Sequence, residues 1–193
     1  DPLKLEISNL KLHPQLHYLC TMRIFLIGYM GSGKTTLGRS LSAILGYRIT
    51  DLDEEFESRY KVSIQDFFSR YGEAPFRQLE QKLLIEYIDD EDVVISTGGG
   101  TPCYANNMDL MLKHGITVYL KMNPQELTER LSVSVRKRPL IMMKQGEDLF
   151  AHVSNHLMQR ENYYNRAHII MNGSHPDARR LAQEIRSHAL FIP

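Results

Sequence analysis

The sequence has no excess of charge of either sign, little cysteine and no long hydrophobic run. Its 193 residues carry 23 Lys and Arg against 23 Asp and Glu, so the formal net charge is zero. Proteins that bind nucleic acid or an anionic membrane surface in general need a strong basic excess. We therefore expect neither nucleic acid nor a membrane as a partner.

The scarcity of cysteine and of apolar runs argues against a disulfide-rich, membrane-spanning or secreted protein. Cys20 and Cys103 are too few for a disulfide framework and fit a reducing compartment. The longest clean apolar run, Ile24–Ile27, is far too short to span a bilayer. The first twenty residues lack the basic start and the continuous apolar stretch of a secretory signal. We expect a cytoplasmic monomer whose length suits one domain.

Short apolar runs alternate with helical patterns along the chain. Strands are predicted at Arg23–Ile27, Tyr47–Thr50, Val93–Ser96, Thr117–Leu120 and His168–Met171. Helical spacing follows the first two runs at 36–45 and 54–59, and then recurs at 76–88, 125–131 and from about residue 177. This alternation predicts a three-layer α/β fold, with a five-stranded parallel sheet flanked by helices.

The two weakly patterned segments lie at the start of the chain and after its middle. Residues 1–21 are predicted to be an extension, so that the working domain covers 22–193. The stretch Ser132–Gly146 is irregular and contains Arg136-Lys137-Arg138-Pro139. We interpret it as a mobile lid.

The strongest motif follows the first predicted strand and reads Gly28-Tyr29-Met30-Gly31-Ser32-Gly33-Lys34-Thr35. It satisfies G-x-x-x-x-G-K-[ST], in which backbone N–H groups surround phosphate oxygens, the lysine reaches the β- and γ-phosphates, and the hydroxyl ligates Mg²⁺. A chance match or an empty glycine turn is disfavoured by the strand before the loop and the helix after it. We assign ATP binding to Gly31, Ser32, Gly33, Lys34, Thr35 and Thr36.

The acidic residues expected beside such a loop come after the second strand, as Asp51-Leu52-Asp53. The third strand ends in Gly98-Gly99-Gly100 without an acid, unlike motor ATPases, and no Asn-Lys-x-Asp segment for guanine occurs. Alternation along a strand would put both carboxylates on one side of the backbone, with Asp51 serving Mg²⁺ and Asp53 facing an acceptor hydroxyl. The competing interpretation is a pair of acids that caps the following helix.

Five motifs in order resemble those of shikimate kinases, from about Met22 to about Ala189. They are Asp51-Leu52-Asp53, Phe76-Arg77-Gln78-Leu79-Glu80, Gly98-Gly99-Gly100, Arg138-Pro139-Leu140 and Arg160 with Tyr164. The family usually has Arg-x-Pro-Leu-Tyr at the last of these, whereas this chain reads Arg160-Glu161-Asn162-Tyr163-Tyr164.

The resemblance implies roles that plain chemistry supports. Arg77, oriented by Glu80, and Arg160 would bind the substrate carboxylate, because a guanidinium can donate two parallel hydrogen bonds. The simpler interpretation of Arg77 is an ion pair with Glu80 alone. Gly98, Gly99 and Gly100 would line the shikimate pocket, although a flexible turn is the plainer interpretation. Cys103, just beyond, is predicted to be a buried thiol without a catalytic role.

Two further arginines are assigned to ATP. Arg138 would close over the γ-phosphate and neutralise charge during transfer, although a lone lid arginine is usually just solvated. Arg130 resembles the arginine that stacks on adenine, with the segment 172–176 on the other side of the base. His152 and His156 are four residues apart on a predicted helix, but no third ligand for zinc is evident.

These features predict ATP-dependent phosphorylation of shikimate, with Asp53, Lys34 and Arg138 as catalytic residues and Mg²⁺ held by Thr35 and Asp51. The chemistry of the residues alone predicts an ATP-dependent kinase that acts on a small anionic polyol. The identification of that polyol as shikimate comes from the resemblance. Two alternatives stay open: another small-polyol kinase such as a gluconate kinase, and a non-catalytic nucleotide-binding module.

Overall fold

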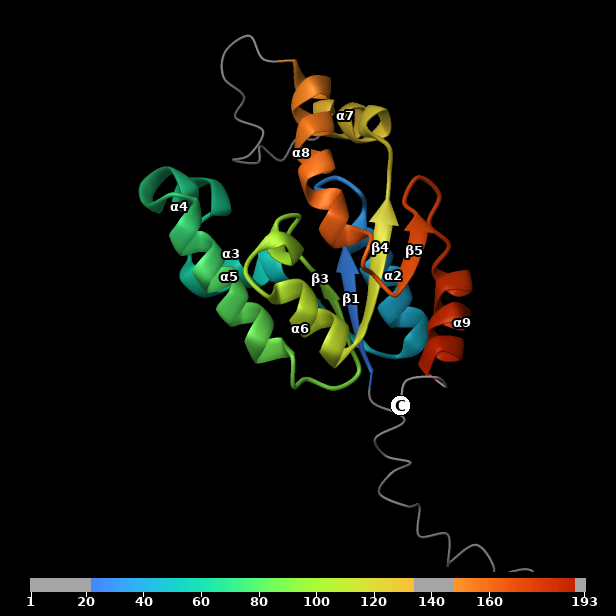
Figure 1. Ribbon diagram of the computed structural model, residues 1–193. Coiled ribbons are helices and arrows are strands. Elements are labelled where there is room, and N and C mark those ends of the chain that lie inside the picture. Colours follow the sequence, from blue (N-terminus) through green and yellow to red (C-terminus); the bar gives the residue numbers. More distant parts are fainter. Residues whose placement is uncertain (1–21, 134–147, 190–193) are drawn as a thin grey trace, which may run out of the picture.

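The computed structural model describes residues 22–133 and 148–189, and its centre is a five-stranded sheet with helices on both faces (Figure 1). The strands are β1 (Arg23–Ile27), β2 (Arg48–Asp51), β3 (Val93–Ser96), β4 (Ile116–Lys121) and β5 (Ile169–Asn172). Their order is β2-β3-β1-β4-β5 and every neighbouring pair is parallel. The predicted three-layer α/β fold is confirmed, and each predicted strand lies within one residue of an observed one.

Helices connect these strands as the parallel order requires. They are α2 (Lys34–Leu45), α3 (Leu52–Tyr60), α4 (Ile64–Tyr71), α5 (Glu73–Tyr87), α6 (Asn107–His114), α7 (Pro124–Ser132), α8 (Leu149–Tyr164) and α9 (Ala178–Ala189). A 3₁₀ helix, Thr101–Cys103, lies between β3 and α6. Because parallel strands share one direction, the loops after their carboxyl ends meet at a single edge of the sheet.

The alternation of side chains along β1 divides the core into two layers. Ile24 and Leu26 pack against α2 and α9, whereas Phe25 and Ile27 pack in the cluster that includes α3, α5 and α8. All four side chains are fully buried. An apolar run without polar alternation is therefore what a central strand covered on both faces requires.

Two helices, α4 and α6, were not predicted from the sequence. The start of α4 carries a readable signal, because the Ser63 hydroxyl accepts the N–H of Asp66 at 3.0 Å and donates to the Asp66 carboxylate at 2.7 Å. A serine whose hydroxyl accepts an N–H of the first turn is a known helix start. Both helices are eight residues long, which leaves few turns over which apolar spacing can recur.

The predicted lid and extension fall mostly beyond what is described. Of Ser132–Gly146, Ser132 ends α7 and Val133 follows it, and the remainder, including Arg138, lies outside the described residues. Residues 1–21 lie outside them as well. Both assignments stay predictions.

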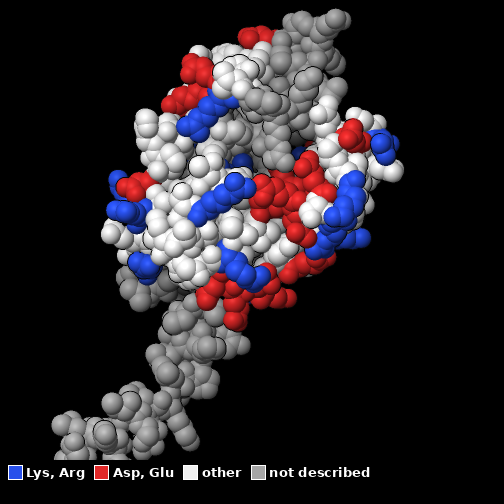
Figure 2. All heavy atoms as spheres, turned by 180° about the vertical axis from the view of Figure 1, so that it is seen from behind, with Lys and Arg blue, Asp and Glu red and all other residues white. Residues whose placement is uncertain are grey.

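Figure 2 shows one face of the molecule, on which acidic side chains gather in a patch with basic side chains placed around it. Lys and Arg on this face are spread among acidic and uncharged side chains. Within 22–133 and 148–189, no helix has the length and apolar character needed to cross a bilayer.

Candidate active site

The phosphate loop joins β1 to α2 at the carboxyl edge of the sheet. Gly28, Gly31 and Gly33 have φ angles of 141°, 80° and 94°, a backbone region that disfavours residues with a Cβ. Gly33 is the N-cap of α2 and supplies no side-chain cap, so the first N–H groups of the helix face the loop without a side-chain acceptor. This arrangement is suited to phosphate, which combines negative charge with acceptor oxygens.

Lys34 lies across the loop that precedes it. Its Nζ donates to the carbonyl oxygens of Gly28 at 2.9 Å and Tyr29 at 3.0 Å, and the residue is 7% exposed. The loop's own carbonyls thus hold the ammonium group at the site where phosphate oxygens are expected. The predicted position of Lys34 in the loop is consistent with its predicted role.

Asp51 serves two purposes at the end of β2. Its Oδ2 accepts the Thr35 hydroxyl at 2.5 Å, while Oδ1 accepts the N–H groups of Asp53 at 3.0 Å and Glu54 at 3.3 Å. The capping interpretation and the interpretation as a ligand therefore both fit, one for each oxygen. A threonine hydroxyl beside a carboxylate is a hard oxygen pair of the kind that Mg²⁺ prefers.

Asp53 does not lie on the strand, and the prediction that strand alternation places it beside Asp51 is wrong. Helix α3 begins at Leu52, so strand alternation does not extend from Asp51 to Asp53. Asp53 instead lies in the first turn of the helix. A Cβ built on Gly98 would lie 3.0 Å from Asp53 Oδ1, which puts this carboxylate beside the glycine segment.

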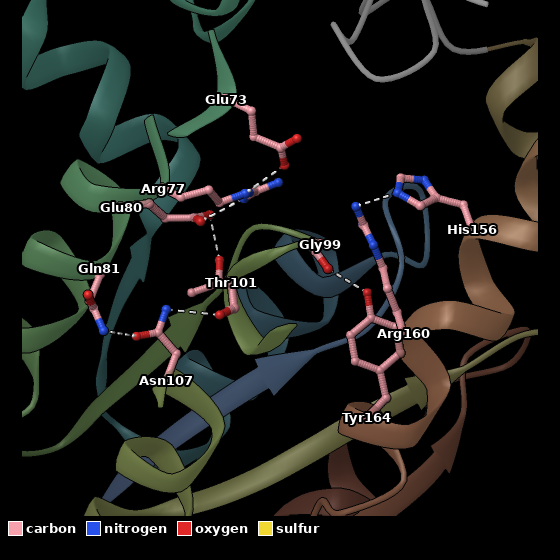
Figure 3. Close-up of polar contacts among 10 residues, drawn as sticks. All are labelled: Glu73, Arg77, Glu80, Gln81, Gly99, Thr101, Asn107, His156, Arg160 and Tyr164. Carbon is pink, nitrogen blue, oxygen red and sulfur yellow. Dashed lines mark hydrogen bonds and ion pairs between the residues drawn. The ribbon is translucent and has the colours of Figure 1, made fainter. Parts of the chain in front are cut away.

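Arg77 and Glu80 form a buried ion pair on α5 (Figure 3). Arg77 Nη1 donates to Glu80 Oε2 at 2.7 Å, and Nε donates to Glu73 Oε1 at 3.0 Å. Glu80 Oε1 accepts the Thr101 hydroxyl at 2.5 Å. Burial disfavours the charged guanidinium, but the carboxylates of Glu80 and then Glu73 outweigh it and raise the pKa of Arg77. The predicted pairing of Arg77 with Glu80 is confirmed, and it leaves Nη2 without a carboxylate partner among these contacts.

The three glycines after β3 make room for this pair. A Cβ at Gly98 would overlap Glu80 Oε1, and a Cβ at Gly100 would overlap the Arg77 guanidinium. At Gly99 the nearest atoms would be Met30 N at 3.2 Å and Arg160 Nη1 at 3.5 Å. Close approach of side chains, rather than a positive φ angle, is what requires glycine at Gly98 and Gly100.

Arg160 approaches the same region from α8. It is 7% exposed, and its Nη2 lies 2.7 Å from His156 Nε2. Tyr164, fully buried, donates its hydroxyl to the Gly99 carbonyl (Figure 3). The departure from the family motif falls on the solvent side of the helix, where Asn162 and Tyr163 are exposed. Both retained residues, Arg160 and Tyr164, face inward.

A cavity of about 320 Å³ brings the two arginines together. Its lining is Glu73, Ala74, Arg77, Gly100, Cys103, Tyr104 and Arg160. The prediction that Cys103 is buried is wrong, because the residue is only partly buried and lines this cavity. Burial still raises the pKa of its thiol to about 11, so the sulfur stays protonated near neutral pH.

Arg130 bridges the phosphate loop and the segment after β5. Its Nη1 donates to the Ser32 carbonyl at 3.4 Å and its Nη2 to the Ser174 carbonyl at 3.3 Å. A second cavity, of about 260 Å³, is lined by Ser32, Gly33, Thr36, Leu37, Ser40, Arg130, Pro176 and Ala178. Four parts of the predicted ATP site thus meet at this cavity: the phosphate loop, Thr36 in the first turn of α2, Arg130, and Pro176 of the segment 172–176.

Sequence reasoning missed Glu73, Thr101 and Tyr29 as contributors to the site, and it considered His156 only as a zinc ligand. The spacing of His156 and Arg160, four residues apart on a helix, was the available signal for their contact. Across the residues that the structure describes, no three His, Cys, Asp or Glu side chains cluster around a possible metal position.

Comparison with known proteins identifies the family. The sequence model described as shikimate kinase matches residues 30–189. A shikimate kinase of Azobacteroides pseudotrichonymphae is 50% identical over 149 residues, which cover 77% of this chain and 88% of that protein. A second, of Phocaeicola vulgatus, is 42% identical over 166 residues, covering 86% of this chain and 95% of the relative.

Solved structures agree with this result. Shikimate kinase from Acinetobacter baumannii in complex with shikimate has a TM-score of 0.79 at 32% identity, covering 92% of this chain and 98% of that one. The enzyme from Bacteroides thetaiotaomicron has a TM-score of 0.76 at 37% identity, covering 88% and 96%. A gluconokinase from Sinorhizobium meliloti, at 16% identity and a TM-score of 0.50, shares the fold alone. The chain belongs to the shikimate kinase family.

Proposed function

We propose that the protein transfers the γ-phosphoryl group of ATP to shikimate, giving shikimate 3-phosphate and ADP. The observation that carries this proposal is the pair of buried arginines, Arg77 and Arg160, which line one small cavity at the end of the sheet that holds the phosphate loop. Arg77 keeps Nη2 clear of its carboxylate partners Glu73 and Glu80, and Arg160 pairs with no carboxylate among residues 22–133 and 148–189. A carboxylate ligand can accept two parallel hydrogen bonds from a guanidinium. An acceptor with one carboxylate and hydroxyl groups fits this cavity.

The acceptor is oriented by the groups around that cavity. Arg77, held by Glu80, and Arg160 would bind the carboxylate, and Gly98, Gly99 and Gly100 would line the floor. Asp53 lies beside Gly98 and would accept a hydrogen bond from the attacking hydroxyl. Alignment of acceptor and phosphate accounts for much of the catalysis in phosphoryl transfer.

The nucleotide is held on the other side of the loop. Backbone N–H groups of Gly31, Ser32 and Gly33 would surround the phosphates, and Lys34 would move its ammonium group from the loop carbonyls to the phosphate oxygens. Thr36 and Arg130 line the adjacent cavity and would contact the nucleoside. The role of Arg138 in covering the γ-phosphate stays a prediction, since this residue lies outside those described.

Mg²⁺ is the cofactor we propose for this site. Thr35 and Asp51 would hold it, because they present a hydroxyl and a carboxylate oxygen 2.5 Å apart next to the phosphate loop. Mg²⁺ is commonly bound through one or two protein oxygens, with water and substrate phosphates completing the shell. When bound, it would supply positive charge to the β- and γ-phosphate oxygens. The cytoplasmic location and the monomeric state stay predictions from the sequence.

An ADP-release assay tests the proposal directly. With ATP and Mg²⁺ present, we expect ADP to form when shikimate is added and not when gluconate is added. Omitting Mg²⁺ should stop the reaction. A folded protein that binds ATP but releases ADP only with gluconate would be a gluconate kinase, and one inert with both acceptors would be a nucleotide-binding module.

A substitution at Gly100 tests the acceptor site separately. In Gly100→Ala, the new methyl group would lie within 2.7 Å of Arg77 Nη1, so the guanidinium has to move. We expect the KM for shikimate to rise about 10- to 100-fold, the range for losing one hydrogen bond to a charged group. The KM for ATP should change little.

Gly99→Ala is the comparison variant, because it adds the same methyl group to the same segment but away from Arg77, at 3.5 Å from Arg160 Nη1. Its methyl group would meet atoms at 3.2 and 3.5 Å, which small shifts can relieve. Steady-state kinetics of the two variants should therefore differ in the KM for shikimate. Equal effects would show that the segment needs glycine for its backbone and not for Arg77.

A further inference from the structure

Arg160 contacts His156, Tyr164 and the Tyr29 ring, and one of its nitrogens is left without a hydrogen bond. Its Nη2 contacts His156, while its Nη1 is buried and has no hydrogen-bond partner among residues 22–133 and 148–189. A buried donor without a partner is costly, and such atoms need an explanation. Arg160 lines the acceptor cavity, so its guanidinium lies where an anionic ligand would bind.

The contact with His156 fixes the state of the imidazole. A guanidinium can only donate, so His156 Nε2 must be the acceptor of the 2.7 Å bond. The neutral ring then carries its proton on Nδ1, which lies 3.1 Å from Tyr29 Oη and can donate to it. Protonation of Nε2 would place a hydrogen atom between two donors and break the bond to Arg160.

The surroundings of His156 favour this neutral form. Burial, followed by the positive charge of Arg160, lowers its pKa to about 4. The titratable or charged groups that face it come from α8, α5 and the phosphate loop: Arg160, His152, Glu73, Arg77 and Tyr29. The ring is therefore uncharged near neutral pH and can remain an acceptor.

Tyr29 ties this arrangement to the nucleotide side. It belongs to the phosphate loop and is 2% exposed, and its ring meets the His156 ring edge-on at 5.8 Å. The Arg160 guanidinium carbon lies 5.7 Å from the centre of the same ring. A chain of contacts thus runs from the phosphate loop through His156 to Arg160, and its first link joins residues 127 positions apart in the sequence.

We propose that His156 is a positioning residue for the acceptor carboxylate, and this inference rests on the proposed function. By occupying Nη2, it fixes the orientation of the Arg160 guanidinium at the wall of the cavity, and Tyr29 anchors the imidazole to the phosphate loop. His156 touches neither substrate in this scheme. Its effect is on how strongly Arg160 recognises a negative charge.

His156→Leu removes the acceptor and keeps a side chain of similar bulk. We expect the KM for shikimate to rise about tenfold, from loss of one oriented charged hydrogen bond, with kcat changed less than about twofold. The same measurement with the uncharged methyl ester of shikimate should show little change. The preference for acid over ester therefore falls about tenfold. His156→Gln, whose amide oxygen can accept from Arg160, should recover most of it.

His188→Leu is the matched control, since it makes the same chemical change on α9, which packs against α2. It should leave the kinetics with both acceptors unchanged. An equal loss for acid and ester in His156→Leu would overturn the proposal, because general disturbance of the cavity would then explain the effect. Unchanged kinetics in that variant would overturn it too.

Two measurements do not depend on turnover. Nitrogen-15 NMR of the imidazole in the wild-type protein should show the proton on Nδ1 and not on Nε2, and the opposite tautomer would contradict the geometry. Calorimetry should show about tenfold weaker binding of shikimate to His156→Leu than to the wild type. A wild-type protein that binds shikimate without phosphorylating it would refute the proposed function and still test His156.

Discussion

Asp53→Asn is expected to lower kcat by about 10²- to 10⁴-fold, the usual range for loss of a group that accepts a proton or orients its donor. The amide has nearly the same shape as the carboxylate and can still accept a hydrogen bond, but it carries no charge and cannot take the proton of the attacking hydroxyl. The position of Asp53 in the first turn of α3, beside Gly98, is set by the Asp51 cap and should survive the change. Most of the loss should therefore appear in the chemical step.

Nucleotide affinity separates this explanation from a general defect. The groups assigned to ATP lie in the phosphate loop and around Arg130, so the Kd for ATP should stay within about twofold of the wild type, well under the effect of one hydrogen bond. Asp89→Asn, an exposed position after α5, makes the same substitution away from the site and should retain full turnover. Loss of ATP binding in Asp53→Asn would refute the division of roles between Asp51 and Asp53.

Arg77→Met should lower the free energy of unfolding by about 3 to 5 kcal/mol, the range for removing one partner of a buried ion pair. Glu80 is 2% exposed and would stay buried, with the Thr101 hydroxyl still donating to its Oε1. For a domain of this size the loss corresponds to a melting temperature lower by about 6 to 20 °C. Shikimate binding should fail in the same variant.

The double variant Arg77→Met with Glu80→Leu separates the contribution of Arg77 to stability from its contribution to shikimate binding. Replacing both charges by apolar side chains should recover most of the stability, because no unpaired charge remains buried. Binding of shikimate should not recover, because the guanidinium is still missing. Recovered binding would mean that Arg77 is structural and that the carboxylate is bound elsewhere.

Arg59→Met provides the comparison for a surface pair. Arg59 bonds to Glu55 at 2.8 Å and Glu86 at 2.5 Å, with the Arg59 and Glu86 side chains 36% and 54% exposed. Exposed ion pairs typically contribute under about 1 kcal/mol. Thermal unfolding of Arg59→Met should therefore resemble that of the wild type, although its hydrogen bonds are as short as those of Arg77.

The strands and the phosphate loop were predicted correctly because each depends on a short, local pattern of residues. The five apolar runs became the five strands. In β1, β3 and β4, which are buried along nearly their whole length, a strand covered on both faces needs apolar side chains in both directions. The glycines of the phosphate loop could be recognised for the same reason, since a positive φ angle is a property of the residue itself. Elements such as α4 and α6 were missed because eight residues give little periodicity.

The sequence did not predict the contacts between segments that are far apart in the chain. Glycine at Gly98 and Gly100 was attributed to ligand approach, yet these residues give space to Glu80 and Arg77 on another helix. The contact of His156 with Tyr29 joins α8 to the loop after β1, and neither segment's sequence indicates that it contacts the other. Such contacts depend on how α5 and α8 pack around the carboxyl edge of the sheet, which a single sequence does not encode locally.

The strand order has a consequence for how specificity can change. Because β2 and β3 lie on one side of β1, and β4 and β5 on the other, the acceptor groups on α3 and α5 are spatially separate from Arg130 and the segment after β5. In the proposed reaction the phosphoryl group would pass from ATP, bound on the β4–β5 side of the sheet, to the acceptor, bound toward the β2–β3 side. Substitutions confined to α3 and α5 would then change which acceptor binds, while the binding of ATP stays the same. Arg160 is the exception, because it reaches the acceptor cavity from α8 and is linked through His156 to Tyr29 of the phosphate loop. A change of acceptor that keeps the carboxylate would therefore leave Arg160 in place and alter α3 and α5.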